Sequence, residues 1–546
     1  MWRKHRRCLL LVILFMTLVL VFLIVKDIHI DSTTDRRRFL EENGMLRATI
    51  KPEFNKAVFV TGFNTETQRV VHLDLKGAPP RLSYLKVLLP ALAAHGCDTL
   101  LIEYEDMFPY TGKIVNISAR NSYTIKEVRE LLTQAHDLGL EVIPLVQTFG
   151  HLEHVLKLKD WSHLREVPPY PQAICPSNPD SFLLIQEMIS QVMAFHVGAR
   201  YIHIGADEVF HLGICPLCVR SNINPTHLFI NHVLKIAQYI TEKYPNVKPI
   251  IWDDMMRSWS KETLKNSKLS DTIEPMVWVY SRNVFETLRY PQWRTYLDVF
   301  PKLWVAGAFK GASKPTSVFP DLMTRYENQR SWLGAFKTLN DKSHPQIVGY
   351  VLTGWSRHDH FSVLCEILPA SLPSLFLNLA VIKEPDSEKS ILLKKWGKAL
   401  SCASTQAANL DALPDVPEFL WYCSFPGSDL FKLLIQLSIL KSNVATIEKT
   451  ITQNQGWMTD YNVRHNFTSP WRIIEDYTRL RVFPTLNNLN IIRKNITTTM
   501  NKYFDFYSTN EFLQQKVLPL QNTLLNLSKT LDRLIVKTTW PRRPLS

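Results

Sequence analysis

The sequence predicts an α/β protein whose main part is a (β/α)8 TIM barrel, with an N-terminal transmembrane anchor and a C-terminal helical domain. Three features of the 546 residues predict this organisation. A long apolar run lies near the N-terminus, and short apolar segments alternate with helical stretches through the middle of the chain. After about residue 385 the strand-like segments stop and long helical periodicities follow.

The apolar run extends from Cys8 to Val25, eighteen residues of which only Thr17 is weakly polar. A helix of this length measures about 27 Å, which crosses the hydrocarbon core of a bilayer with slight thinning. A cleaved signal peptide is the alternative, but its apolar core is usually shorter and ends in a small-residue cleavage site, which this run lacks. The four basic residues before the run place residues 1–7 in the cytoplasm.

The chain is therefore expected to be a single-pass type II membrane protein of the secretory pathway, in the Golgi or a related compartment. Residues 8–25 form the signal anchor, residues 26–54 form a stem, and the catalytic domain is lumenal or extracellular. Seven cysteines follow the anchor, and this odd number leaves at least one of them without an intramolecular partner. Four N-glycosylation sequons agree with this compartment: Asn116, Asn466, Asn495 and Asn526.

Residues 55–385 are the predicted barrel. Their short apolar segments lack strict alternation, as expected for strands that are buried on both faces of a parallel sheet. An open, doubly wound sheet is the alternative, although no glycine-rich nucleotide-binding motif opens a helix. The eight predicted strands are Arg69–Leu75, Thr99–Tyr104, Glu141–Val146, Arg200–Ile204, Pro249–Trp252, Met276–Tyr280, Leu303–Ala306 and Val348–Leu352.

Helical signals separate most of these strands. Leucines with helical spacing before Gly96 predict a helix and its end, and Thr124 with Glu127 resembles a capping box. Residues 386–546 are the predicted helical domain, packed on the barrel; the heptads are too irregular for a free coiled coil. Its apolar periodicities are Leu430, Leu434, Leu437, Val444, Ile447 and Ile451, and then Phe512, Val517, Leu520, Leu524, Leu527, Leu531 and Leu534.

The formal net charge is +13, but four of the basic residues precede the apolar run and the others are spread along the chain. No basic stripe with interleaved aromatic residues is present, so nucleic-acid binding is not expected. The oligomeric state does not follow from the sequence.

Catalytic groups of a (β/α)8 barrel lie at the C-terminal ends of its strands. The most informative strand end is Tyr201–Glu208, where an apolar strand leads through Gly205 and Ala206 to the adjacent carboxylates Asp207 and Glu208. Two close, partly desolvated carboxylates raise one pKa, and the protonated group can act as a general acid. An acidic loop without function is the alternative, because acidic residues are also common in turns.

The pattern H-x-G-x-D-E, formed by His203, Gly205, Asp207 and Glu208, resembles the signature of family-20 glycoside hydrolases, the β-N-acetylhexosaminidases. The similarity extends in matching order over roughly residues 55–385 and is typical of the hexosaminidase D branch. It includes the segments EYEDMFPY at 103–110, TFGHLEH at 148–154, IWDDMM at 251–256 and LTGWSRHDH at 352–360.

The resemblance implies an exo-β-N-acetylhexosaminidase that removes terminal, non-reducing β-linked GalNAc or GlcNAc from a glycoconjugate with retention of configuration. In this family the 2-acetamido oxygen of the substrate attacks the anomeric carbon and forms an oxazolinium intermediate, so the enzyme supplies no nucleophile. Glu208 would then protonate the leaving oxygen and activate water, and Asp207 would orient the acetamido group. No metal or organic cofactor is implied.

Other positions that match the family are expected to bind the sugar. Tryptophans at predicted strand ends would form the walls, Tyr280 would bind the acetamido oxygen, and barrel packing is the alternative for Trp304. In place of the arginine that grips the sugar hydroxyls in many members, this chain has Lys76, a point donor without a bidentate fork. The expected substrate-binding residues are Asp106, His151, Asp254, Trp278, Tyr280, Trp304, Trp355 and Asp359.

Two alternatives to an active hydrolase remain. A retired hydrolase fold could bind glycans or act as a scaffold without cleaving them, although the intact acid pair argues against this. A metal-dependent hydrolase could use the cysteines as ligands. Cys215 and Cys218 form a C-x-x-C motif that favours a disulfide or a loop-shaping pair over half of a metal site, because no second C-x-x-C pairs with it.

Overall fold

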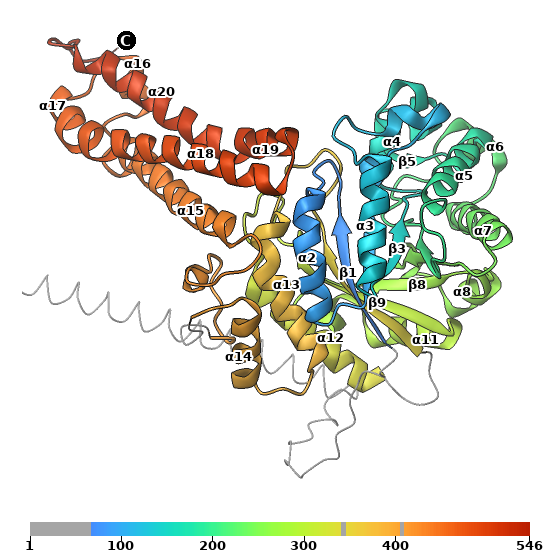
Figure 1. Cartoon of the computed structure of the whole chain (residues 1–546). Coiled ribbons are helices and arrows are strands. Elements are labelled where there is room, and N and C mark those ends of the chain that lie inside the picture. Colours follow the sequence, from blue (N-terminus) through green and yellow to red (C-terminus); the bar gives the residue numbers. More distant parts are fainter. Residues whose placement is uncertain (1–66, 340–345, 404–408, 546) are drawn as a thin grey trace, which may run out of the picture. The chain divides into compact units, whose positions relative to one another are not determined.

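A computed structural model describes residues 67–339, 346–403 and 409–545. At its centre, eight parallel strands close into a barrel in the order β1-β10-β9-β8-β7-β6-β3-β2 (Figure 1). The closed barrel confirms the predicted fold and contradicts the open sheet. The strands are β1 (Gln68–Asp74), β2 (Thr99–Glu103), β3 (Glu141–Leu145), β6 (Tyr201–His203), β7 (Lys248–Trp252), β8 (Glu274–Trp278), β9 (Lys302–Lys310) and β10 (Gln346–Gly354).

The strands are apolar on both faces because one set of side chains fills the barrel and the other packs against the surrounding helices. Strand β1 closes the ring by pairing with β2 on one side, where Val70 lies opposite Thr99, and with β10 on the other, where Val70 lies opposite Val351. The buried interior is formed by Val70, Leu101, Ile143, Leu145, Tyr201, Ile250, Trp252, Met276, Trp304, Ala306 and Val351.

Helices follow the strands and surround the barrel (Figure 1). The Thr124 capping box is present, with its hydroxyl accepting from Glu127 N and the Glu127 carboxylate accepting from Thr124 N. Gly96 has φ +97°, where the chain leaves the preceding helix. The helices are α2 (Leu82–Ala94), α3 (Ile125–Asp137), α4 (Glu153–Leu156), α5 (Pro179–Met193), α6 (Pro216–Ser221), α7 (Pro225–Lys243), α8 (Lys261–Asn266), α9 (Leu269–Thr272), α10 (Val284–Thr287), α11 (Tyr290–Val299), α12 (Leu322–Leu339) and α13 (Leu368–Lys383).

Sequence reasoning missed one sheet. Strands β4 (Arg165–Val167) and β5 (Tyr170–Ile174) form an antiparallel hairpin in the segment between β3 and α5. The two strands are short and only partly buried, so neither carries the apolar run by which the barrel strands are recognised. This hairpin packs beside the functional site.

The helices after the barrel confirm the predicted helical periodicity. All six apolar positions of the first predicted periodicity are buried, and so are five of the seven in the second, namely Phe512, Val517, Leu524, Leu531 and Leu534. The elements are α14 (Lys389–Ala399), α15 (Ser428–Lys449), α16 (Asp460–Arg464), α17 (Pro470–Arg472), the π-helical Ile473–Val482, α18 (Phe483–Tyr503), α19 (Phe506–Phe512), the π-helical Leu513–Val517 and α20 (Leu518–Ile535).

These helices are joined to the barrel by polar contacts. The guanidinium of Arg81, before α2, donates to the carbonyl oxygens of Asn501 and Phe504 at 2.9 and 2.8 Å. Behind β10, Arg357 donates both terminal nitrogens to the carboxylate of Glu511 at 2.5 and 2.6 Å. Two parallel hydrogen bonds between a guanidinium and a carboxylate fix the relative orientation of the two side chains. This pair therefore holds α19 against the loop that follows β10.

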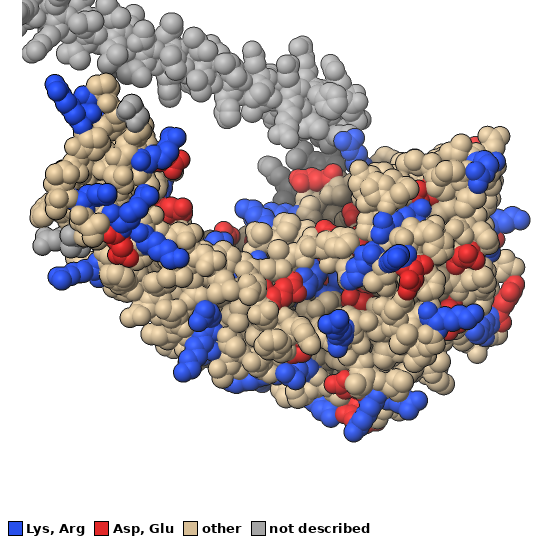
Figure 2. Space-filling view, turned by 90° about the horizontal axis from the view of Figure 1, so that it is seen from above, with Lys and Arg blue, Asp and Glu red and all other residues tan. Residues whose placement is uncertain are grey.

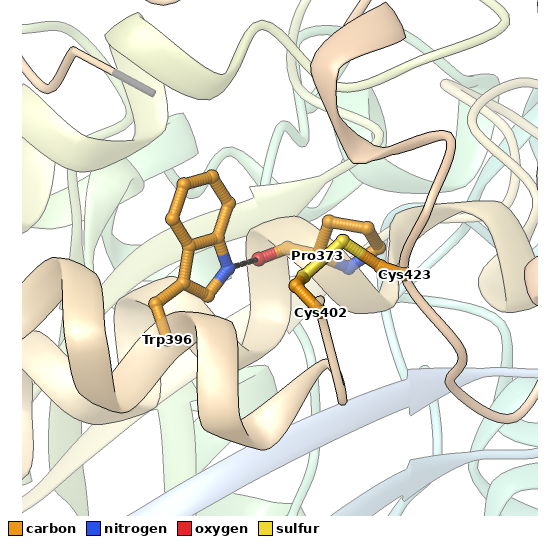
Figure 3. Close-up of a disulfide and its surroundings, with 4 residues drawn as sticks. All are labelled: Pro373, Trp396, Cys402 and Cys423. Atoms are coloured by element: carbon orange, nitrogen blue, oxygen red, sulfur yellow. Dashed lines mark hydrogen bonds between the residues drawn. A yellow bond between two sulfur atoms is a disulfide. The ribbon is translucent and has the colours of Figure 1, made fainter. Parts of the chain in front are cut away.

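A disulfide joins Cys402, after α14, to Cys423 in the segment before α15 (Figure 3). The same region is held to α13 by the indole of Trp396, which donates to the carbonyl of Pro373 at 2.8 Å. Closing a segment with a sequence separation of 21 removes about 3 kcal/mol of chain entropy from the unfolded state.

The predicted tail, anchor and stem (residues 1–54) lie outside the described residues. Within the part that is described, one helix, Ser428–Asn454, is long and apolar enough to cross a membrane by length and composition alone. It includes α15, which packs against α13, α18 and α20, and a packed core helix satisfies the same criterion. On the face shown in Figure 2, lysine and arginine side chains are scattered among acidic and neutral residues.

Candidate active site

The candidate site lies at the C-terminal ends of the barrel strands. There a cavity of about 240 Å³ opens to solvent. It is lined by Lys76, Gln147, His151, Asp207, Glu208, Trp252, Trp278, Tyr280, Gly311, Ala312, Trp355 and His358.

The segment after β6 turns sharply before it presents its two acids. Gly205, Ala206 and Glu208 have φ values of +64°, +69° and +49°. A Cβ atom on Gly205 would lie 1.9 Å from Gln147 Oε1, so only glycine fits there. Two non-glycine residues in the left-handed region store strain at the functional segment, and the surrounding contacts must maintain it.

Those contacts come from neighbouring strand ends. Asp254, after β7, accepts from the backbone N–H of Glu208 at 2.9 Å and from the Trp278 indole at 3.1 Å. Gln172 of β5 donates to the Glu208 carbonyl at 3.0 Å. Burial, with Asp253 next to it, raises the pKa of Asp254 to about 6. Asp254 therefore holds the segment of Glu208 and is not among the residues that line the cavity.

His151 bridges the two acids. Its Nε2 lies 3.1 Å from Glu208 Oε2 and 3.4 Å from Asp207 Oδ2. Burial disfavours the imidazolium, but the charge of Asp207 and the hydrogen bond to Glu208 outweigh it and raise the pKa of His151 to about 10. A cation thus lies between the carboxylates near neutral pH.

The two acids have opposite pKa shifts. Burial, with Asp254 and Glu103 nearby, raises the pKa of Asp207 to about 7 although His151 opposes this. The hydrogen bond with His151 lowers the pKa of Glu208, whose side chain is 37% exposed. The sequence predicted one raised pKa and, by resemblance, Glu208 as the acid. In the free site the raised pKa belongs to Asp207, because its side chain is buried, whereas Glu208 is partly exposed and is hydrogen-bonded to His151.

The cavity walls are aromatic. The Trp355 indole donates to the Tyr280 hydroxyl at 3.2 Å, and the ring of Tyr280 lies 5.1 Å from that of Trp278. The structure therefore brings together His151, Asp207, Glu208, Trp278, Tyr280 and Trp355, as expected. It adds Trp252, which forms part of the wall and had been recognised only as a barrel residue.

Lys76 lines the cavity and is surrounded by acidic side chains. Its Nζ is 3.4 Å from both Asp74 Oδ2 and Glu105 Oε1 and 3.8 Å from Glu103 Oε1, and it lies 5.3 Å from the Trp355 ring centre. Burial opposes its charge, but these carboxylates raise the pKa of Lys76 well above its usual value. Lys76 is therefore a fixed cation after β1, in the stretch where many family members have the arginine that binds the sugar hydroxyls.

Besides Asp254, three expected substrate-binding residues lie outside the cavity. Trp304 is fully buried inside the barrel, where its indole donates to Glu274 Oε2 at 2.7 Å. The expected strand ended at residue 306, whereas β9 continues to Lys310, so Trp304 is near the N-terminal end and Gly311 and Ala312 reach the cavity. This is the barrel-packing role given as the alternative.

Asp106 and Asp359 also lie outside the cavity. Asp106 lies 3.7 Å from both Lys157 Nζ and His360 Nε2. Asp359 accepts from the backbone N–H groups of Phe361 and Ser362 at 2.8 and 2.9 Å and shapes a turn. His358, which directly precedes Asp359, was not among the predicted site residues, but its side chain lines the cavity. The direction of each side chain in this loop depends on local turns that sequence spacing does not specify.

The Cys215–Cys218 motif forms no disulfide in the structure. Cys215 Sγ instead accepts from the backbone N–H of Cys218 at 3.3 Å, at the start of α6. The expected disulfide between these two cysteines is therefore not formed in the structure, and their role stays open between a loop-shaping pair and metal ligands.

Acidic side chains beside aromatic rings at the C-terminal end of a (β/α)8 barrel are an arrangement expected of a barrel enzyme that acts on a sugar. Comparison with known proteins specifies this further. Residues 89–357 match the model of the glycosyl hydrolase family 20 catalytic domain. The chain belongs to this family and is a glycoside hydrolase.

The relatives carry the similarity beyond the catalytic domain. Human hexosaminidase D is 33% identical over 491 residues, which is 89% of this chain and 98% of that protein. Hexosaminidase D of Bos taurus is 38% identical over 330 residues, 59% of this chain and 94% of the relative. Among solved structures, β-N-acetylhexosaminidase from Bacteroides fragilis has a TM-score of 0.47 at 16% identity, and the match covers 61% of this chain and 70% of that one.

Proposed function

We propose that this chain is an exo-β-N-acetylhexosaminidase that hydrolyses terminal non-reducing β-linked GalNAc or GlcNAc with retention, through an oxazolinium intermediate formed by the substrate. The names of the relatives support the activity. The observation that carries the mechanism is the division between two adjacent acids, one buried and one reaching the cavity mouth.

Asp207 has the environment of an acetamide partner. Its side chain is buried, and Oδ1 has no hydrogen-bond partner among the described residues. A buried, unpaired carboxylate oxygen is costly, so a ligand N–H that reaches it is bound with a large gain. An ionised Asp207 would accept the acetamido N–H and stabilise the positive charge that develops as the acetamido oxygen attacks the anomeric carbon.

Glu208 has the environment of the proton carrier. It is partly exposed and hydrogen-bonded to His151, so in the free site the proton resides on the imidazole. A sugar that fills the cavity removes water from Glu208 and favours its neutral form. His151 is one hydrogen bond away and would supply that proton. Glu208 would then protonate the leaving oxygen and, as the carboxylate, activate the water that opens the oxazolinium ring.

The remaining lining residues would hold the sugar. Trp278, Trp355 and Trp252 supply flat apolar surfaces for the sugar face and the acetamido methyl group. The hydroxyl oxygen of Tyr280 accepts a hydrogen bond from the Trp355 indole. This contact holds the hydroxyl in place, and its O–H would donate to the acetamido oxygen. Lys76 would donate to sugar hydroxyls as a single point charge.

The direct experiment is hydrolysis of chromogenic aryl β-N-acetylglucosaminide and β-N-acetylgalactosaminide by the purified chain. Glu208→Gln should lower kcat by about 10²–10⁴-fold because it removes the proton carrier. Asp207→Asn should lower kcat by about 10²–10³-fold because the acetamide loses its charged acceptor. The exposed Glu187, on α5, provides the control Glu187→Gln, which should leave kcat unchanged.

Three results would contradict the proposal. Binding of both substrates without turnover would indicate a glycan-binding protein. Equal cleavage of an aryl glycoside without the 2-acetamido group would exclude assistance by the substrate. Inversion of the anomeric configuration in the first-formed product, followed by NMR, would exclude the two-step route.

We also propose that the chain is a type II membrane protein with its catalytic domain on the lumenal side. The apolar run of residues 8–25, outside the described residues, is the proposed anchor, and the Cys402–Cys423 disulfide suits an oxidising compartment. Of the sequon asparagines, Asn116, Asn495 and Asn526 are exposed, and Asn466 is half-buried.

Protease treatment of intact microsomes tests this topology. The body of the protein should be protected until detergent is added, and removal of N-glycans should lower its mass. Digestion of the body in intact microsomes would refute the proposed orientation.

A further inference from the structure

A cluster of four potential metal ligands lies beside the catalytic segment and has no part in the chemistry above. We call it the thiol cluster: Glu166 of β4, Cys175 after β5, Cys215 before α6 and Cys218 in α6. All four side chains are buried, and one ligand atom from each lies within 4.8 Å of all the others. None of the four lines the cavity of the acid pair.

We propose that the thiol cluster binds one Zn²⁺ ion in a tetrahedral site of three thiolates and one carboxylate, and that this ion fixes the β4–β5 hairpin against the loop that follows the catalytic acids.

The spacing of the atoms fits such a site. With Zn–S of about 2.3 Å and Zn–O of about 2.0 Å, tetrahedral angles place sulfurs about 3.8 Å apart and a sulfur and an oxygen about 3.5 Å apart. Cys175 Sγ lies 3.7 Å from Cys218 Sγ and 3.1 Å from Cys215 Sγ. Cys218 Sγ lies 3.3 Å from Glu166 Oε2. Two of these three separations lie within about 0.2 Å of the tetrahedral values, and the remaining ligand atoms lie within 4.8 Å of one another.

The burial and orientation of Glu166 also favour a bound cation. Its side chain is 0% exposed, and among the described residues it makes no ion pair with a lysine, arginine or histidine. Oε1 accepts from the backbone N–H groups of Ile214 and Cys215 at 2.6 and 3.0 Å, which orients the carboxylate and leaves Oε2 directed at the sulfurs. A carboxylate buried without a cation is unfavourable, and a bound divalent ion removes that cost.

Hydrogen bonds around the sulfurs suit thiolates. The backbone N–H of Cys218 donates to Cys215 Sγ at 3.3 Å, and the Ser177 hydroxyl lies 3.1 Å from Cys218 Sγ, where it can donate once that sulfur is ionised. Such outer contacts orient metal ligands and support their charge. Three sulfur ligands with one oxygen in a closed, buried site favour zinc over the hard ions calcium and magnesium.

A disulfide would account for only two of the four side chains in the thiol cluster. Any disulfide within the cluster pairs two cysteines and leaves the third thiol and the Glu166 carboxylate buried without a partner charge. Zinc engages all four groups at once. The other free cysteines described, Cys97 and Cys365, lie outside the cluster and have no second sulfur within hydrogen-bond distance.

The position of the site gives the ion a consequence for the enzyme. Strand β5, which directly precedes Cys175, carries Gln172, which donates to the Glu208 carbonyl, and Ile174 N donates to Phe149 O in the loop of His151. Zinc joins this hairpin to the segment 209–218 directly after Glu208. The four ligands are therefore positioning residues, because they hold both the acid and its histidine partner.

The test is the metal content of the full-length chain, purified without a polyhistidine tag and measured by elemental mass spectrometry. We expect about one zinc ion per chain. Cys218→Ser and Cys175→Ser should each lose the metal, whereas Cys97→Ser, a buried cysteine without other ligands, should retain it. Cobalt that replaces the zinc should show a thiolate-to-metal charge-transfer band.

Thiol mapping provides a second measurement that does not depend on variants. When the wild-type chain is unfolded with a chelator and without a reductant, Cys175, Cys215 and Cys218 should all be alkylated. A disulfide between any two of them, or a metal-free chain with three reactive thiols after growth in zinc-containing medium, would overturn the proposal. Both readouts are independent of hydrolysis, so failure of the proposed activity would not be confused with failure of this site.

The effect on catalysis is measured separately. In metal-free Cys218→Ser that remains folded, kcat for the aryl substrate should fall at least about tenfold while KM changes little. The reason is that displacement of Glu208 slows proton transfer more than it weakens substrate binding. An unchanged kcat would show that the ion does not position Glu208.

Discussion

Replacement of His151 by glutamine tests the electrostatic arrangement of the two acids. Glutamine preserves a side chain that can donate a hydrogen bond but removes the positive charge between Asp207 and Glu208. A cation stabilises ionised carboxylates, so its loss raises the pKa of both acids. Because the two are coupled, both limbs of the bell-shaped pH profile of kcat/KM should move to higher pH.

The size of the shift follows from the contacts. A hydrogen bond to a charged group contributes about 1.5–3 kcal/mol. The Glu208 side chain is 37% exposed, so solvent screening reduces this by about half, which leaves about one pKa unit. Asp207 is buried and lies 3.4 Å from the imidazole, so its shift should be larger, about 1–3 units.

The assay is the pH dependence of kcat/KM for the aryl β-N-acetylglucosaminide, measured for wild type and His151→Gln. His358→Gln is the matched control, because His358 lines the same cavity without a hydrogen bond to either acid among the described contacts. It should shift the profile much less. If His151→Gln leaves the profile in place, or moves it to lower pH, the assignment of a charged imidazole between the acids is wrong.

Three further changes test the frame of the site. In Gly205→Ala the new Cβ meets Gln147, and the residue must keep a positive φ, so we expect a loss of about 1–3 kcal/mol in stability, seen as a lower melting temperature, and a large drop in kcat; unchanged kinetics would contradict the required glycine. Trp304→Phe leaves Glu274 without its buried donor, which should cost about 1–3 kcal/mol in thermal unfolding while KM remains unchanged; a raised KM would instead place Trp304 in contact with the sugar. Cys402→Ser opens the disulfide loop and should lower the free energy of unfolding by about 3 kcal/mol without affecting kcat; an equal melting temperature would show that the crosslink adds nothing.

The barrel could be predicted because each of its strands is a short apolar segment that is buried on both faces. The periodicity of residues 430–451 likewise predicted α15, whose leucines are buried. The β4–β5 hairpin could not be found in this way, since strands of three and five residues at a partly exposed edge have no distinctive pattern. The predicted strand Leu303–Ala306 ended four residues before β9 does, at Lys310. The sequence therefore placed Trp304 near the C-terminal end of this strand, whereas it lies near the N-terminal end.

What the sequence by itself determined was the class of the fold, the family and the identity of the acid pair, because apolar periodicity and an uninterrupted motif are local properties of the chain. Only the tertiary structure decided how the two acids differ. Their pKa shifts depend on His151 and Asp254, which come from other strands and are far away in sequence. The thiol cluster is a second case, since Glu166 and Cys175 meet the C-x-x-C motif only when the hairpin folds back against the loop after β6. Burial and charge act through space, so residues that control the chemistry can be recognised only once the barrel has closed.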